Sequence, residues 1–144
     1  MHINFNSHPR FDETDFEVVI TPEHLTPYEK DGYGENCTMR AFAVNHAELV
    51  ELFKTHACTA DHEHFYDDEK PLLLYIPDGN VMEECIFFEF PRLTVWTEEE
   101  EADNGYIIPA VPPSEVEALC RFAFPNITSD FIENVVWYNW TDMQ

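Results

Sequence analysis

Apolar blocks of strand length gather in the middle of this chain, between polar stretches that contain turn residues. The pattern predicts strands at residues 72–76, 85–90 and 93–97. The first of these runs is too short for a helix and apolar enough for a strand at the centre of a sheet. Pro77 begins a turn signal that ends at Asn80, because proline presets φ and glycine or asparagine accepts a positive φ. We therefore expect an antiparallel sheet with a meander around residues 72–97.

Helical periodicity, with apolar residues three or four positions apart, marks two further segments. The pattern predicts helices over residues 45–57 and 114–123. Asn45 with Glu48 is an N-cap signal for the first helix, and Ser114 with Glu117 is a capping box for the second. The expected buried faces consist of Leu49, Leu52, Phe53 and His56 in the first helix and of Val116, Leu119, Cys120 and Ala123 in the second.

The rest of the chain has weaker patterns. Two more strands are predicted at residues 15–20 and 37–44, and loops at residues 22–34 and 60–70. Residues 129–140 have apolar positions at helical spacing, but the β-branched and aromatic residues from Val135 to Trp140 suit a strand as well, so both alternatives stay open. The elements together predict an α+β fold, with an antiparallel sheet and two or three helices in a single pair of layers.

Chain length and composition place these elements in one domain. With 144 residues, of which 44% are hydrophobic, the chain has the size of a single domain and enough apolar side chains for a core. No composition shift marks a linker, so residues 1–144 are expected to fold together. No basic and apolar leader is present, and no apolar run approaches the roughly 20 residues that cross a bilayer. We therefore expect a cytoplasmic protein.

The charge is the unusual property of the chain. Asp and Glu number 29 against 7 Lys and Arg, which gives a formal net charge of -22. Charged residues make up an ordinary 25% of the chain, so the imbalance lies in the sign of the charges and not in their number. The basic residues are scattered singly along the chain. Such a surplus repels nucleic acid and anionic membranes and attracts basic surfaces over a Debye length of about 8 Å. We expect neither direct nucleic-acid binding nor membrane binding.

One cluster has the residue types of a zinc site. His56, Cys58, His62 and His64 bring four zinc-competent side chains within nine residues. Zinc motifs normally place two ligands on each of two separated turns, and here no second pair follows. A histidine at a helix end also interacts favourably with the helix dipole. We therefore expect structural roles for these residues, and no metal or other cofactor.

Catalytic motifs are absent from the sequence. The chain has no G-x-S-x-G, no H-E-x-x-H and no glycine-rich phosphate loop among its four glycines. The cysteines are far apart in apolar patterns, which favours reduced, buried thiols over a disulfide framework; they are Cys37, Cys58, Cys85 and Cys120. A metal- or thiol-dependent enzyme would need tertiary contacts that sequence does not show. We expect a protein without enzymatic activity.

Charge and size together suggest a function. A charge of -22 equals that of roughly 11 base pairs, or about 37 Å of duplex, which is also the approximate diameter of a compact domain of this length. We therefore expect an inhibitor, or DNA mimic, that binds the basic nucleic-acid-binding surface of another protein. Anti-restriction, anti-CRISPR and nuclease-immunity proteins, as found in phages and mobile elements that evade host defence, resemble this chain in charge and size only. An acidic adaptor or accessory subunit is the alternative.

Two acidic runs are the expected contacts with such a partner. Both flank predicted strands, and neither can be buried, because charge burial without partners is costly. They offer the densest negative charge that a partner could reach with the domain folded. The predicted contact residues are Glu98, Glu99, Glu100, Glu101 and Asp103 in one run and Asp67, Asp68 and Glu69 in the other.

Overall fold

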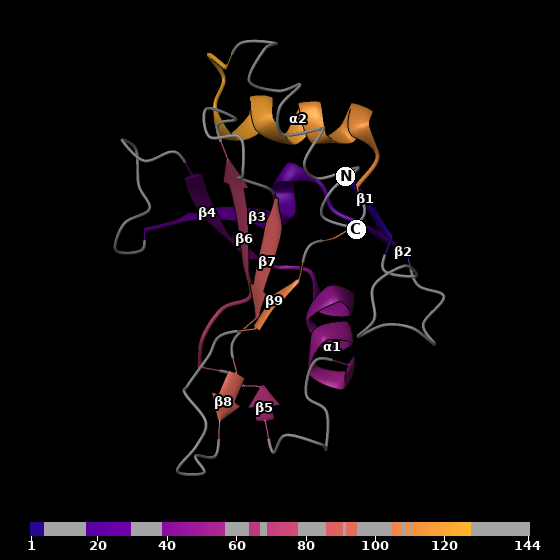
Figure 1. The fold of residues 1–144 in the computed structure, drawn as a ribbon, viewed down its shortest axis with the longest axis vertical. Coiled ribbons are helices and arrows are strands. Elements are labelled where there is room, and N and C mark those ends of the chain that lie inside the picture. The colour runs from indigo at the N-terminus through magenta and orange to yellow at the C-terminus, as the bar shows by residue number, and fades with distance from the viewer. Residues whose placement is uncertain are drawn as a thin grey trace.

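A five-stranded antiparallel sheet forms the centre of the described structure (Figure 1). Its strands are β3 (Leu25–Tyr28), β4 (Met39–Val44), β6 (Leu73–Pro77), β7 (Phe87–Phe90) and β9 (Gly105–Ile107). They pair in the order β3-β4-β6-β7-β9. The computed structural model describes residues 1–4, 17–29, 39–56, 64–66, 69–77, 86–90, 92–94, 105–107, 109 and 111–127. These strands, with two helices, confirm the expected α+β fold with antiparallel pairing.

Strand β6 lies in the middle of this sheet and is buried along its whole length. Its Leu74 pairs with Phe42 of β4 on one side and with Phe88 of β7 on the other. Successive side chains of a strand point to opposite faces, so an all-apolar strand needs apolar cover on both faces. The short apolar run at residues 72–76 predicted such a central strand, and the prediction is confirmed.

The predicted meander is confirmed for its first hairpin and is wrong for its third strand. β6 and β7 pair antiparallel, but the next strand, β8 (Arg92–Thr94), does not join them. β8 pairs with β5 (His64–Tyr66) in a separate two-stranded sheet, and β9 lies beside β7 instead (Figure 1). Turn residues indicate where a strand ends, but they do not indicate which strand it pairs with. β5 also corrects part of the loop predicted over residues 60–70, because three residues are too few to establish a strand pattern.

The first part of the chain adds another antiparallel pair, β1 (His2–Asn4) with β2 (Glu17–Val19). β2 lies within the strand predicted at residues 15–20, whereas β1 was not predicted. The loop predicted at residues 22–34 is wrong in its first half, which forms the 3-10 turn η2 (Pro22–His24) and β3. Proline suits the start of such a turn, since its missing N–H has no partner there.

The helices α1 (Ala47–His56) and α2 (Pro113–Ala123) lie where the periodicity predicts them. Their predicted caps are wrong. Leu49 N–H donates to Nδ1 of His46 at 3.2 Å, so His46 rather than Asn45 caps α1. α2 begins one residue before Ser114, and its N-cap residue Pro112 makes no side-chain cap. Neither described helix is long and apolar enough to span a membrane.

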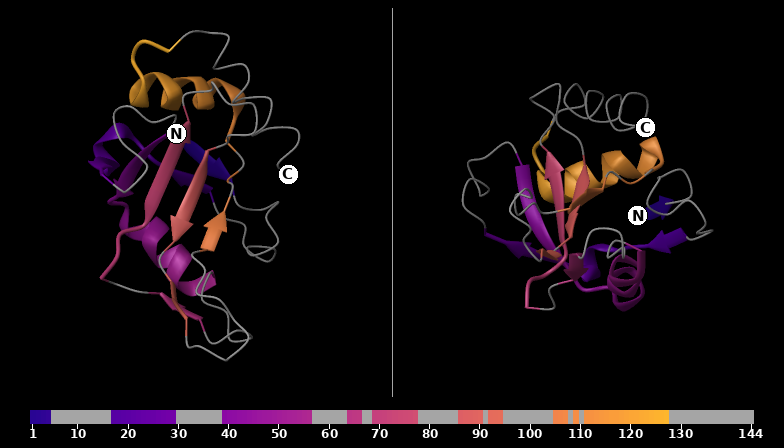
Figure 2. Two further views of the ribbon diagram at one scale, coloured as in Figure 1. Left: turned by 60° about the vertical axis from the view of Figure 1, so that its left-hand side comes forward. Right: turned by 60° about the horizontal axis from the view of Figure 1, so that its bottom comes forward.

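The main core lies between one face of the sheet and the two helices. α2 crosses one end of β6, and α1 lies toward the opposite end (Figures 1 and 2). The predicted apolar faces of both helices are buried there, apart from His56, whose side chain is outside the described residues. Cys120 is buried in this core as a reduced thiol, as expected; the other three cysteines are outside the described residues. Ile3, Val18 and Ile20 extend the core to the β1–β2 pair.

Candidate functional site

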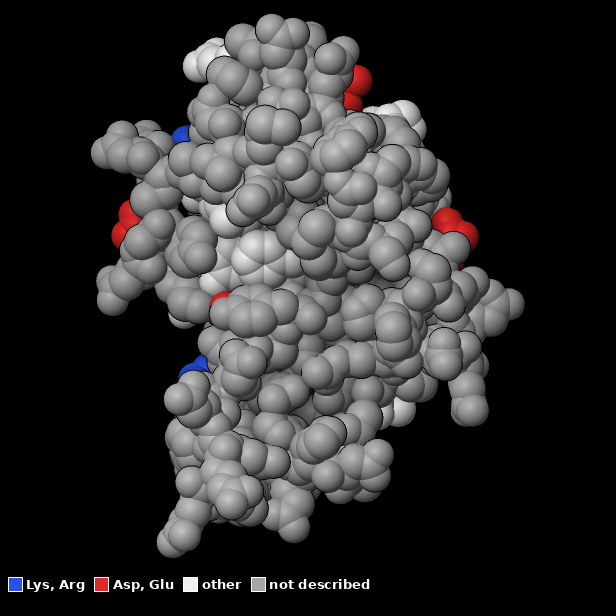
Figure 3. Space-filling view, viewed as in Figure 1, with Lys and Arg blue, Asp and Glu red and all other residues white. Residues whose placement is uncertain are grey.

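The acidic residues of the described ranges lie mostly at the surface. Nine of the 29 acids fall in these ranges, and all nine are glutamates. Glu89 is buried and Glu115 is partly buried, while the other seven are exposed: Glu17, Glu23, Glu29, Glu48, Glu51, Glu69 and Glu117. On the face in Figure 3, the described carboxylates that come into view lie apart from one another rather than in one patch.

Of the predicted contact residues, the structure describes Glu69, which is exposed in a turn just before β6. Asp67, Asp68, Glu98, Glu99, Glu100, Glu101 and Asp103 lie outside the described residues. The chain leaves β5 after Tyr66, which pairs with Arg92, and leaves β8 after Thr94, which pairs with His64. These exits are at opposite ends of the ladder, so the pairing of β5 with β8 does not by itself bring the two acidic runs together.

Several bases of the described ranges serve local contacts. Arg40 donates from Nη1 to the carbonyl oxygen of Ala123 at 2.6 Å, and its guanidinium lies 4.8 Å from the Phe124 ring centroid. Arg121 Nε donates to Glu117 at 3.1 Å, and Lys54 lies 3.7 Å from Glu51, each pair within one helix. Exposed pairs of this kind contribute about 0–1 kcal/mol. The described ranges hold five bases against nine acids, so these bases cannot neutralise the acids one for one.

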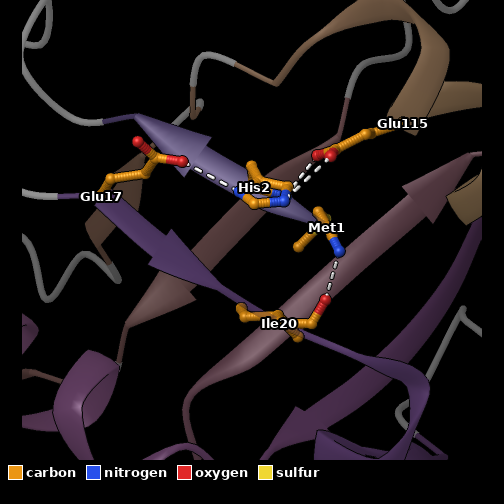
Figure 4. A network of polar contacts seen from close by, with 5 residues as sticks. All are labelled: Met1, His2, Glu17, Ile20 and Glu115. Carbon is orange, nitrogen blue, oxygen red and sulfur yellow. Dashed lines mark hydrogen bonds and ion pairs between the residues drawn. The ribbon is translucent and has the colours of Figure 1, made fainter.

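A polar network surrounds His2 and joins three elements (Figure 4). The imidazole Nδ1 lies 2.9 Å from Glu17 Oε1 on β2, and Nε2 lies 3.5 Å from Glu115 Oε1 on α2. The His2 backbone N–H also donates to Glu115 Oε2. At the adjoining pair, the Met1 ammonium donates to the Ile20 carbonyl, and Ile20 N–H donates to Met1 O at 2.6 Å. The network ties β1 to both β2 and α2.

An apolar cavity of about 80 Å³ lies beside this network. Its lining includes Met1 and Ile20 from the β1–β2 side and Leu25 at the start of β3, and α2 contributes Ala118, Leu119 and Phe122. Glu115 lies on the lining as well, so the residue that binds His2 also belongs to the cavity wall. Phe122 is 38% exposed, which places this region at the molecular surface.

Two more histidines meet where η2 approaches the start of α1. Their rings are 4.8 Å apart in a T-shaped arrangement, His24 from η2 and His46 from the α1 cap. Thr21 N–H donates to Nδ1 of His24 at 3.0 Å, as Leu49 N–H does to Nδ1 of His46. Each Nδ1 therefore needs a lone pair, which assigns the proton of the neutral ring to Nε2.

The four residues with zinc-competent side chains, for which structural roles were expected, are only partly described. His56 ends α1 and His64 begins β5, and these two elements are in contact. Cys58, His62 and the side chains of His56 and His64 lie outside the described residues. Among the side chains that the structure does describe, no three of His, Cys, Asp or Glu are placed to hold a metal ion. In the His2 network both ring nitrogens face carboxylate oxygens.

A buried carboxylate lies on the second face of the sheet. Glu89 is 7% exposed and accepts a hydrogen bond from the Tyr75 hydroxyl at 3.2 Å. The Tyr75 ring stacks on Phe87 at a centroid distance of 4.6 Å. This pair was not predicted, although a lone acid in the apolar run of residues 86–90 is a signal that indicates a buried carboxylate. The His2 network has no such signal, because its members are up to 113 residues apart.

Comparisons with protein-family models, curated proteins and solved structures find no match to this chain. The described residues form an acidic α+β framework with a histidine–carboxylate network at one surface.

Proposed function

We propose that this protein is a non-enzymatic acidic inhibitor that acts in the cytoplasm and binds the basic, nucleic-acid-binding surface of another protein. The observation that carries the proposal is a net charge of -22 on a chain with a packed apolar core. Because unpaired charges are costly to bury, such a chain keeps most of its carboxylates in water, where a basic surface can meet them.

The distribution of charge along the chain supports the predicted contacts. The described ranges hold nine acids and five bases, a net of -4, so 18 of the 22 surplus charges belong to the remaining segments. The framework itself is therefore only mildly acidic. The predicted contact residues other than Glu69 belong to the strongly acidic remainder, which makes these segments the main source of attraction for a basic partner.

A cleavage assay with nucleic-acid enzymes tests the proposal. We would add the protein to a restriction endonuclease, a DNase and an RNA-guided nuclease, each acting on plasmid DNA. We expect inhibition of at least one enzyme, with an affinity that falls steeply as salt rises, because the attraction is between exposed charges. Inhibition of none, or binding that is independent of salt, would contradict the proposal; weak salt dependence would favour an adaptor with an apolar interface.

Two matched charge variants locate the contacts. Replacing Glu98, Glu99, Glu100 and Glu101 by Gln removes four charges while keeping side-chain size. The control replaces Glu23, Glu29, Glu48 and Glu51, four exposed acids of the described framework, in the same way. We expect the first variant to lose more affinity than the control, mainly through a slower association rate. Equal losses would mean that net charge alone matters and that residues 98–101 are not specific contacts.

A further inference from the structure

Buried core residues form the inner lining of the apolar cavity beside the His2 network. Ile20, Leu25 and Leu119 line the cavity, and all three are buried. They come from the β1–β2 side, from the start of β3 and from α2, and they pack together in the main core. The inner surface of the cavity is therefore fixed by core packing, and the cavity is already formed in the folded chain.

Exposed residues surround the opening of this cavity. Ala118 and Phe122 lie one turn apart on α2, and Thr21 and Pro22 contribute from the start of η2. All four are exposed, although three of them are apolar. Phe122 is one of the three large hydrophobic side chains that are exposed among the described residues. An apolar lining that is open to solvent is typical of a recognition site.

Polar groups along the lining have partners within the chain. The Met1 ammonium donates to the Ile20 carbonyl, and the Ile20 N–H donates back to the Met1 carbonyl. Thr21 N–H donates to Nδ1 of His24 at 3.0 Å, and Glu115 accepts a backbone N–H of β1. A group that enters the cavity therefore meets apolar surface, which favours an aliphatic group over a polar one. Water is a poor occupant too, because it needs two to four polar partners.

The volume of the cavity limits the size of the group that it can hold. A dry apolar cavity of roughly 150 Å³ binds benzene. The cavity of this protein has about 80 Å³. It therefore suits an aliphatic side chain, such as that of leucine, better than an aromatic ring. An aliphatic side chain held in a pocket can anchor a protein interface, with charged residues around it.

Carboxylates lie beside the opening. Glu115 is part of the lining, and Glu23 follows Pro22 in η2. Glu17 is linked to Glu115 through His2, since the two ring nitrogens face these two carboxylates. Glu17 and Glu23 are exposed. The N-terminal ammonium is directed to a backbone carbonyl. This charge favours an occupant that carries Lys or Arg beside its aliphatic side chain.

We propose that this cavity binds an aliphatic side chain on the basic surface of the partner protein, and that Lys or Arg residues beside it face Glu17, Glu23 and Glu115. The inference rests on the proposed function for the basic partner and adds an apolar anchor to its interface. The carboxylates raise the association rate, and the anchor slows dissociation.

Two peptides of equal charge test the cavity in the full chain. Both have the sequence Lys-Lys-X-Lys-Lys with blocked ends, and X is leucine in one and alanine in the other. We expect the leucine peptide to bind about tenfold more tightly, because it buries more apolar surface. The methyl signals of Leu25, Ala118 and Leu119 in nuclear magnetic resonance spectra report the affinity and the place of binding. Equal affinities, or no shift of these signals, would overturn the proposal.

Matched substitutions at two exposed alanines separate the cavity from the general charge. Ala118→Leu places a larger side chain at the opening, whereas Ala47→Leu makes the same change on α1, toward the other end of β6 (Figure 1). The preference for the leucine peptide should be lost in A118L and kept in A47L. A preference that persists in A118L would contradict the proposal. The comparison of the two peptides on the wild-type chain does not depend on how either variant folds.

The same two variants distinguish this inference from the proposed function. In the nuclease assay, A118L should inhibit about fivefold less strongly than A47L, because it lacks the anchor. Equal inhibition by A118L and A47L would refute the anchor and leave the acidic inhibitor standing. A chain that prefers the leucine peptide but inhibits none of the nucleases would refute the proposed function and leave the cavity as a site for an aliphatic side chain of another basic protein.

Discussion

Single histidines in this molecule have different hydrogen-bonding roles. Both ring nitrogens of His2 face carboxylate oxygens, of Glu17 on β2 and of Glu115 on α2. His24 and His46 instead accept backbone hydrogen bonds at Nδ1. His46 thereby serves as the side-chain cap of α1.

Two substitutions at His46 test this cap. Serine is a good N-cap residue, so His46→Ser should change the free energy of unfolding by less than about 0.5 kcal/mol. His46→Ala removes the acceptor and should lower the free energy of unfolding by roughly 1 kcal/mol, the usual value of a cap. Urea denaturation measures both variants; equal losses in the two would contradict the role of His46 as the cap.

Among the elements, the start of α2 predicts whether a substitution raises or lowers the stability of the fold. The sequence pattern indicates Ser114 as the cap, whereas the helix begins at Pro113 and places Ser114 inside its first turn. Alanine has the higher helix propensity at an interior position, so Ser114→Ala should be neutral or stabilising by up to about 0.5 kcal/mol. A true N-cap serine would instead cost about 1 kcal/mol on replacement. Urea denaturation distinguishes the two signs, and a clear loss of stability would contradict the observed start of the helix.

Long or strongly apolar elements were predictable from the sequence, and short ones were not. The helices and β6 carry a periodicity or an apolar run that spans the whole element. β1, β5 and β8 have three residues each, too few for a period, and their partners are set by contacts distant in the sequence. The predicted caps were wrong because His46 is not one of the usual N-cap residue types and because Pro112 has no side chain that can act as a cap.

The candidate site also has one part that was predictable from the sequence and one part that was not. Local composition indicates the acidic runs, of which the structure describes Glu69 at the surface. The His2 network depends on β1, β2 and α2 coming together, so no local window of sequence contains its pattern. The pairing of Tyr75 with Glu89 arises from neighbouring strands and needs the sheet register to be seen.

At the scale of the whole molecule, charge repulsion opposes folding. Raising the ionic strength from about 0.1 M to about 1 M shortens the Debye length from roughly 10 Å to roughly 3 Å. Screening should relieve repulsion among the surplus carboxylates, and a gain of about 1 kcal/mol would raise the melting temperature by roughly 2–8 °C. Calorimetry in sodium chloride measures this shift. A melting temperature that does not change with salt would mean that the charges are better balanced in space than along the sequence.

The edge of the sheet at β3 limits the ways in which another protein chain can bind there. Among the described strands none lies beyond β3, and Thr26, Pro27 and Tyr28 are exposed there. A proline has no N–H to offer, so this four-residue edge is a poor template for a strand supplied by another chain. Recognition by strand addition, in which backbone hydrogen bonds provide the affinity, is therefore disfavoured on this side. A partner that binds at this edge would therefore be recognised through the exposed side chains of β3 rather than through its backbone.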